Sequence, residues 1–165
     1  MNFQFYVEKL KSLENYKKFV KENSSAFVCS CFFVVDEVGK DSKQHFDFWI
    51  PEEKKMFSFQ LENNGELIPV DEVGNFVPEK IELNLDFDFN YIKKIIEEKM
   101  LQEGIKNKIQ KMLLSLQKKE GKHFLVGTVF ISLMGMIKVS VDLDEMKLLD
   151  FEKKSFFDIM KVKKK

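Results

Sequence analysis

The pattern of apolar and polar residues along the chain predicts a β-rich protein with two amphipathic helices. The longest uncharged run is FLVGTVFISLMGMI, from Phe124 to Ile137. It is shorter than the roughly 20 apolar residues that a membrane-spanning helix needs. Its β-branched and aromatic residues favour a strand, and so apolar a run is typical of strands that are covered on both faces. We therefore expect one or two central strands here, with Gly135 at the break.

Helical spacing of apolar residues indicates where the two helices lie. Between Phe5 and Lys21, apolar side chains recur at intervals of three and four residues. A second helix is expected to start at a cap formed by Asp88 or Asn90 and to end at about Glu103, just before Gly104. Each helix would bury its apolar stripe on one face of a sheet.

Several further segments have the pattern of strands. The clearest alternation runs from Ile81 to Phe89, where apolar residues alternate with acidic or amide residues. The segment from Ile105 to Lys118 fits a helix by propensity and a strand by its position before a turn, and we interpret it as a strand. The remaining expected elements are strands at 26–35, 45–50, 56–61, 139–141 and 148–151 and a short helix at 155–160.

The order of these elements predicts an α+β protein made of two helix-plus-antiparallel-meander units, with sheets packed on amphipathic helices. Residues 1–65 would form the first unit, residues 66–80 a linker, residues 81–160 the second unit and residues 161–165 a basic tail. The stretches WIPEEKKMFSF at 49–59 and VDLDEMKLLDF at 141–151 have turns of similar character, which indicates an internal repeat. The two sheets could pack together or join.

Two segments of the second half carry a family resemblance. PEKIELNLDFDFNYIKKIIEEK, from Pro78 to Lys99, resembles the acidic lead-in and helix of PepSY domains, and MIKVSVDLDEMKLLDFE, from Met136 to Glu152, resembles their closing hairpin. PepSY repeats usually carry a glycine at that hairpin turn, where this chain has the residues from Asp142 to Met146. The resemblance implies a cystatin-like fold and a small interaction or inhibitor-like module rather than an enzyme.

Composition narrows the range of partners. The chain has 165 residues, of which 44% are hydrophobic and 33% charged, as expected for one globular domain or two small ones. Its 27 basic and 27 acidic side chains give a net charge of zero, and every basic residue is a lysine. Without a net field or the bidentate arginine fork, we expect no nucleic-acid partner and no membrane association. No signal peptide is visible, and two cysteines then favour the cytoplasm.

Four residues are candidates for a metal site. Cys29 and Cys31 are two apart on a predicted strand, so they would share a face. With His45 and His123 they could form a zinc set, but zinc ligands are normally spaced more tightly. We therefore expect buried thiols and strand-end histidines. Because the chain also lacks a nucleophile motif and a phosphate-binding loop, we expect no catalytic residue and no cofactor.

Three further clusters could carry a function, although each has a simpler interpretation. An acidic turn could bind calcium or magnesium but lacks the spacing of an EF-hand, so we expect a solvated turn. Five methionines could line a peptide groove, although core packing is the expected role. The lysines at the end of the chain are expected to be a solvated tail. These clusters are Asp142, Asp144, Glu145, Asp150 and Glu152; Met100, Met112, Met134, Met136 and Met146; and Lys161, Lys163, Lys164 and Lys165.

The absence of catalytic motifs and the PepSY resemblance together favour a non-enzymatic module that binds a protein or peptide. Such a module would use a sheet edge or the concave face of the sheet. One alternative is a small-ligand or enzymatic pocket that holds His45, His123 or the acidic turn. Another is association with nucleic acid or the ribosome through lysines that gather on one face. The sequence leaves the oligomeric state open.

Overall fold

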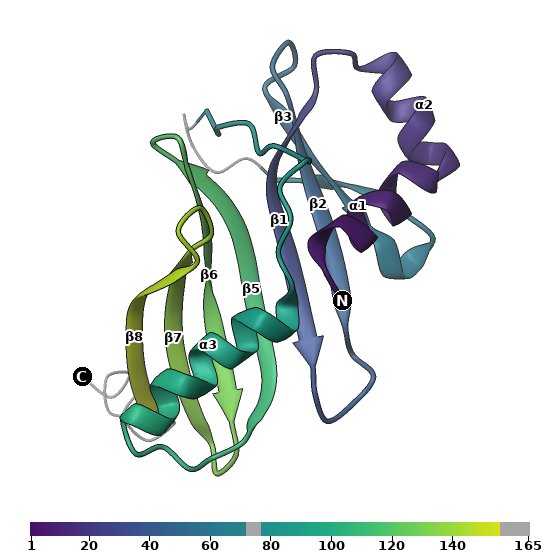
Figure 1. Cartoon of the computed structure of the whole chain (residues 1–165). Coiled ribbons are helices and arrows are strands. Elements are labelled where there is room, and N and C mark those ends of the chain that lie inside the picture. Colours follow the sequence, from purple (N-terminus) through teal and green to yellow (C-terminus); the bar gives the residue numbers. More distant parts are fainter. Residues whose placement is uncertain (72–76, 156–165) are drawn as a thin grey trace, which may run out of the picture.

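The computed structural model describes residues 1–71 and 77–155. Within these ranges the protein is α+β, with three α-helices and one eight-stranded antiparallel sheet. The helices lie on one face of the sheet (Figure 1). The prediction of an α+β protein with antiparallel strands is therefore confirmed, and the strands of the two halves join in a single sheet.

In both halves the α-helical part comes first and four strands follow. The first half has helices and then four strands, and the second half has one helix and then four strands. The elements are α1 (Phe3–Ser12), α2 (Glu14–Glu22), β1 (Phe27–Asp36), β2 (Lys43–Ile50), β3 (Lys55–Gln60), the short 3₁₀ helix η1 (Leu61–Asn63) and β4 (Glu66–Val70), followed by α3 (Phe89–Gln102), β5 (Ile109–Lys119), β6 (Lys122–Ile131), β7 (Gly135–Asp142) and β8 (Lys147–Ser155).

The strand order is symmetric about the centre of the sheet. It runs β4-β3-β2-β1-β5-β6-β7-β8, so each half is a meander and the two first strands, β1 and β5, pair antiparallel where the halves meet. The helix layer has a matching arrangement, because Asn2 and Asp88 form an isolated antiparallel bridge directly before α1 and α3. Each of these residues also caps its helix by accepting a backbone hydrogen bond, from Phe5 and Asn90 respectively.

Pairing across the strands separates the side chains into two faces. One row, which points toward the helices, is apolar on all eight strands because it forms the floor of the core. The side chains of the next row point to the opposite side of the sheet, which we call the open face. This row contains both polar and apolar side chains. The first row is Leu67, Phe59, Phe46, Cys31, Leu116, Leu125, Val141 and Leu148, and the second is Glu66, Gln60, His45, Phe32, Ser115, Val126, Ser140 and Asp150.

The halves are connected by residues 77–88, which we call the crossover segment and which runs beside β1 to the start of α3 (Figure 1). Its strict alternation predicted a strand from Ile81 to Phe89, and that prediction is wrong, since none of these residues belongs to the sheet. The backbone N–H of Ile81 donates to the Val28 carbonyl at 2.8 Å, and the Gln4 amide donates to the carbonyls of Leu83 and Leu85. The alternation arises because an extended chain buries every second side chain on the core.

Other elements differ from their predictions in ways that have clear causes. The helix predicted from Phe5 to Lys21 is two helices, because Leu13 has an extended backbone with ψ of 132°. The predicted linker at 66–80 begins with strand β4, which pairs with β3 despite containing Pro69. Pro69 is tolerated there because β4 is an edge strand, where the missing N–H costs no ladder bond.

The uncharged run from Phe124 to Ile137 lies, as predicted, in strands of the sheet, β6 and the start of β7. The break falls at residues 132–134, and Gly135 begins β7. The expectation that both faces of this run are covered is wrong: Val126, on the open face, is 38% exposed.

The ambiguous segment from Ile105 to Lys118 contains strand β5, so its interpretation as a strand is confirmed. The helix predicted to end at about Glu103 is confirmed as α3. The turns compared as a repeat, at 51–54 and 143–146, join β2 to β3 and β7 to β8, so they do not hold equivalent places in the two meanders. The short helix predicted at 155–160 lies outside the described residues except for Ser155, which ends β8.

Candidate functional site

The two cysteines do not share a face of the sheet, contrary to the prediction. The pairing of β1 with β2 shifts register between Val28 and Ser30, and this bulge places Cys29 out of the alternation. Cys31 belongs to the core, whereas Cys29 lines a cavity together with Ser30 on the open face. Burial raises the pKa of the Cys29 thiol to about 12 and raises the pKa of Cys31 as well. Both are buried free thiols without the lowered pKa of a reactive cysteine, as the sequence indicated.

The two histidines lie on opposite faces of the sheet, so they cannot join the cysteines in one zinc set. His45 is on the open face, in the row that includes Phe32, and its Nε2 atom is 2.7 Å from the Glu62 carboxylate. His123 is on the helix side, with Nδ1 3.3 Å from Asp144 and a buried Nε2 that has no hydrogen-bond partner among the described residues. Within those residues, no group of three or more His, Cys, Asp or Glu is placed to hold a metal ion.

The acidic turn organises the backbone between β7 and β8. The Asp142 carboxylate is buried and accepts hydrogen bonds from the backbone N–H groups of Asp144 and Glu145 at 2.9 and 3.1 Å. Asp144 in turn accepts from the backbone N–H of His123 at 3.0 Å, which lowers the pKa of its carboxyl. Asp150 and Glu152 lie on the neighbouring strand β8. The cluster is therefore a hydrogen-bonded turn, only part of which is solvated.

The methionines do not line a common groove. Met100 and Met112 are buried in the core, as expected, whereas Met134 is exposed in the turn before β7. Met136 and Met146 are partly buried. The lysines at 161–165 lie outside the described residues. No helix within the described ranges is long and apolar enough to cross a membrane.

The centre of the open face carries the strongest candidate for a functional surface. Its apolar side chains come from three adjacent strands, β1, β5 and β6, and each points away from the helices because its neighbours in the sequence point into the core. Val126 is exposed, Val34 is buried, and the other three are partly exposed. We call this set the apolar patch; it consists of Phe32, Val34, Leu113, Val126 and Phe130.

Charged residues of both signs surround the apolar patch. In the row of Leu113, the strands beyond the patch carry Lys138 and Glu152, and the row of Phe130 contains Lys111 and Lys154. Asp36 lies opposite Lys111 on β1. An apolar centre with a polar rim is the usual anatomy of a protein–protein interface.

A cavity of about 480 Å³ adjoins the apolar patch. Its wall includes Ser30, two residues before Phe32 on β1, and Ser115, which pairs with Phe32 from β5. Val77 and Pro78 of the crossover segment also line it. Neither histidine nor the acidic turn lines this cavity or the second cavity described below. The prediction that a pocket would hold those residues is therefore not met by either of these two cavities.

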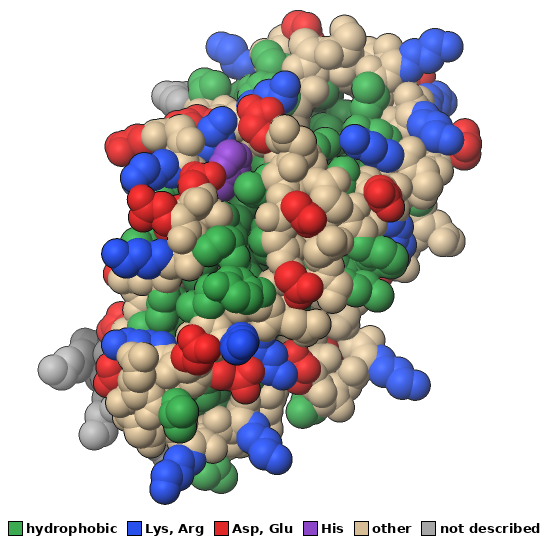
Figure 2. Space-filling view, in the orientation of Figure 1, with side chains coloured by type: hydrophobic (Ala, Val, Ile, Leu, Met, Phe, Trp, Pro, Cys, Tyr) green, Lys and Arg blue, Asp and Glu red, His purple; other side chains and the backbone are tan. Residues whose placement is uncertain are grey.

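Lysines on the helix side of the molecule do not form a patch of positive charge. Figure 2 shows lysine and acidic side chains interspersed over that face. Several lysines are paired, including Lys93 with Glu37 and Lys118 with Glu82 at 3.3 and 3.7 Å. The charges on this face are therefore mixed in sign.

Comparison of the chain with family models, with curated proteins and with solved structures found no match. The features that distinguish the candidate surface are therefore those of the fold itself. Sequence patterning could not single out the apolar patch, because Phe32, Leu113 and Val126 lie in runs that are apolar on both faces. The signal that identifies them is the placement of all three described helices on the opposite side.

Proposed function

We propose that the protein is a non-enzymatic module that binds another protein through the apolar patch. The observation that carries this proposal is the contrast between the two faces of the sheet. The helix side is covered by the three described helices, whereas on the open face Val126 is 38% exposed and Phe32, Leu113 and Phe130 are partly exposed. Apolar surface left in water is stabilised when a partner covers it.

The face of the sheet is a better candidate than either edge. The edge strand β4 is only 5 residues long and contains Pro69, which cannot donate a backbone hydrogen bond. The other edge strand, β8, carries charged residues such as Asp150, Glu152 and Lys153. Short strands, prolines and charges on an edge are the usual means by which proteins prevent a further strand from pairing.

The chemistry of the rim indicates the kind of partner. Lys138 and Glu152 lie side by side on the open face, as do Asp36 and Lys111. Because charges of both signs alternate there, a polyanion such as nucleic acid would meet repulsion as well as attraction. A protein with an apolar centre and mixed charges at its own rim fits this surface, and the 480 Å³ cavity beside the patch could receive a projecting side chain.

A single charge on the patch tests the proposal. Val126 lies between Ser115 and Ser140 on the neighbouring strands, so Val126→Lys places a lysine among small polar side chains and should fold normally. The matched control is Leu101→Lys on α3, since Leu101 is also exposed, at 78%, but lies in the helix layer. Tagged protein would capture partners from a native lysate, and quantitative mass spectrometry would compare the variants.

The proposal expects one protein to be enriched reproducibly by the unsubstituted chain and by Leu101→Lys. Enrichment should fall at least about tenfold with Val126→Lys, because a buried charge at an interface centre removes a large share of the binding energy. Absence of any reproducible partner, or equal enrichment by Val126→Lys, would contradict the proposal. Circular dichroism of each variant excludes unfolding as the cause.

We further propose that the two halves derive from one helix-plus-four-strand unit, with the PepSY resemblance confined to the second half, and that the protein works in the cytoplasm. The symmetric strand order and the matching caps at Asn2 and Asp88 support the common origin. Two free buried thiols, Cys29 and Cys31, support a reducing compartment.

A further inference from the structure

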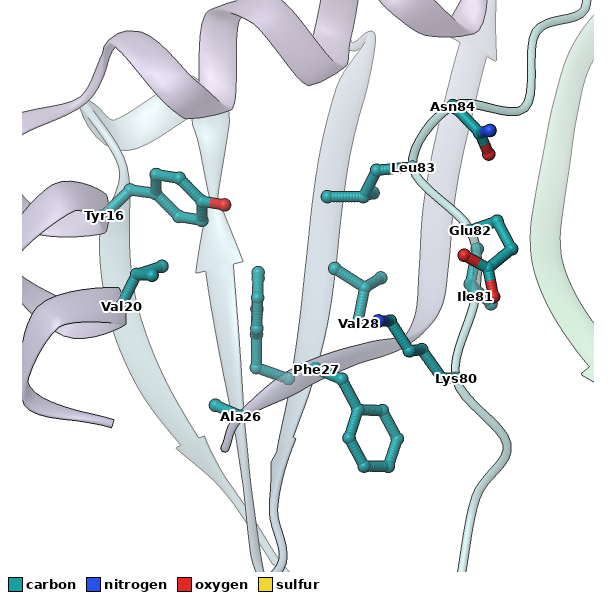
Figure 3. Close-up of a pocket in the computed structure, with 11 residues that line it drawn as sticks. Tyr16, Val20, Ala26, Phe27, Val28, Lys80, Ile81, Glu82, Leu83 and Asn84 are labelled. Atoms are coloured by element: carbon teal, nitrogen blue, oxygen red, sulfur yellow. The ribbon is translucent and has the colours of Figure 1, made fainter. Parts of the chain in front are cut away.

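A second cavity, of about 320 Å³, lies on the helix side of the first half. It is bounded by α2 on one side and by the crossover segment on the other, and the start of β1 and part of β2 form its floor (Figure 3). Its volume is at the lower end of the range for small-ligand sites. The apolar part of the lining comes from Val20, Ala26, Phe27, Val28, Phe48 and Leu83.

Two polar groups reach into this cavity without a partner in the described part of the chain. The Tyr16 hydroxyl points into the cavity from α2, and the Lys80 side chain extends into it from the crossover segment (Figure 3). No hydrogen bond joins the Tyr16 hydroxyl to a described residue, and no described acidic group lies within ion-pair distance of Lys80. Glu82 also lines the cavity, but its carboxylate is 3.7 Å from the Lys118 ammonium. The cavity therefore offers an ammonium group on an exposed lysine and a hydroxyl, neither of which is paired with a described residue.

Contacts within the protein hold the walls of the cavity in place. The Tyr16 ring contacts the rings of Phe48 and Phe59, with centroids 5.9 Å apart in each pair. The crossover segment is held by the Ile81 N–H, which donates to Val28, and by Gln4, whose amide donates to the Leu83 carbonyl at 2.7 Å. A preformed site avoids the entropic cost of ordering its walls when the ligand binds.

We propose that this cavity binds a small amphiphile with a carboxylate head, of the size of a medium-chain fatty acid. The carboxylate would accept a charge-assisted hydrogen bond from the Lys80 ammonium, and the hydrocarbon would cover Val28, Phe48 and Leu83 and extend toward Tyr16 on the opposite wall. The site is independent of the apolar patch, because it lies on the opposite face of the sheet.

Calorimetric titration of the full chain with octanoate and with 1-octanol tests this assignment. We expect saturable one-to-one binding of octanoate with a dissociation constant below about 1 mM. Lys80→Gln should weaken octanoate binding about five- to tenfold, since it removes one charge-assisted hydrogen bond, and should leave 1-octanol binding unchanged. The matched control is Lys138→Gln on the open face, which should alter neither affinity.

A second variant fills the cavity rather than removing its charge. Ala26→Leu adds three carbons, a methine and two methyl groups, to the lining, so the affinities for octanoate and 1-octanol should fall together. Lack of saturable octanoate binding would overturn the proposal, as would equal effects of Lys80→Gln and Lys138→Gln. Undiminished binding by a folded Ala26→Leu protein would show that the ligand binds elsewhere and would overturn it as well.

Discussion

The two halves of the sheet follow the same plan but fill their cores with different side chains. In the first half, rings pack on rings: Phe48 contacts Tyr16, Phe19 and Phe59 at centroid distances between 5.4 and 5.9 Å. Every aromatic pair among the described residues involves positions between Phe3 and Phe89. The core of the second half is aliphatic. Its buried residues include Ile92, Ile96, Leu114, Leu116, Leu125, Val129, Ile137, Val139 and Val141.

This difference shows that one layered arrangement tolerates two kinds of packing. The rings of the first half meet mostly edge to face, a geometry that aromatic pairs favour. In the second half, Gly127 of β6 lies so close to the β5 backbone that a Cβ atom would not fit. Most of the buried phenylalanines lie in the first half.

The largest effect is expected at Phe3, where the aromatic core meets the crossover segment. Phe3 is fully buried and contacts Phe33 and Phe46 of the first sheet half as well as Phe87 of the crossover segment. Phe3→Ala should lower the free energy of unfolding by about 4 kcal/mol, because it leaves a cavity the size of a ring. Urea denaturation measures this loss.

The control for Phe3→Ala is Phe5→Ala in the same helix, where the side chain is 45% exposed. That change should cost less than about 1 kcal/mol. If the halves were separate folding units, Phe3→Ala would shift only one of two transitions. We expect a single transition that shifts as a whole, since Phe3 contacts both the first half and the crossover segment.

A smaller but specific effect is expected at Gly127 in the aliphatic half. A Cβ atom there would lie 1.9 Å from the carbonyl oxygen of Leu113, so the β5 or β6 backbone would have to move. Gly127→Ala should therefore cost about 3 kcal/mol, whereas alanine usually favours a folded chain over glycine. Gly104→Ala is the control: its Cβ would meet open space, and only its positive φ of 72° should cost about 1 kcal/mol. Equal losses for the two variants would refute the close approach of β6 to β5.

The smallest effect concerns the acid sensitivity of the second half. The backbone N–H of His123 donates to Asp144 and lowers the pKa of its carboxyl below the ordinary value of 3.8. The resulting stabilisation is complete above that ordinary value and is lost as the pH falls through the lower pKa of the folded state. Because the Asp144 side chain is 42% exposed, the contribution should be less than about 1 kcal/mol.

Urea midpoints measured between pH 6 and pH 2.5 would reveal this contribution. Asp144→Asn should flatten the acid limb of the curve. Asp150→Asn should leave it unchanged, because the Asp150 carboxylate accepts no hydrogen bond from the described residues. In the first half, hydrogen bonds from the loop backbone lower the pKa of Asp36 in the same direction. Its loop should therefore account for acid sensitivity that remains in Asp144→Asn.

The sequence predicted most strands and the second helix because their patterns reflect local geometry. The runs at 26–35 and 45–50 correspond closely to β1 and β2. Asp88 caps α3, as its position before an apolar stripe indicated. Buried thiols at Cys29 and Cys31 also follow from their surroundings in an apolar strand, whereas the separation of these two cysteines depends on a bulge that no pattern reveals.

Two incorrect predictions show that the periodicity of apolar residues does not reveal strand pairing or which face the helices cover. From Ile81 to Phe87, alternation records burial on one side, and it does not distinguish a paired strand from an extended segment held by side chains such as Gln4. The open face was missed for a related reason. Phe124 to Ile131 is apolar on both faces, and only the spatial arrangement shows that the three described helices lie on one face.

The central pairing of β1 with β5 has a consequence for how the chain reaches its folded state. Every other strand pair joins neighbours along the sequence, but this pair connects Ser30 with Gln117 and Asp36 with Lys111. Closing so long a loop costs entropy before any contact compensates for it. We therefore expect the hairpins to form early and the pairing of β1 with β5 to limit the refolding rate.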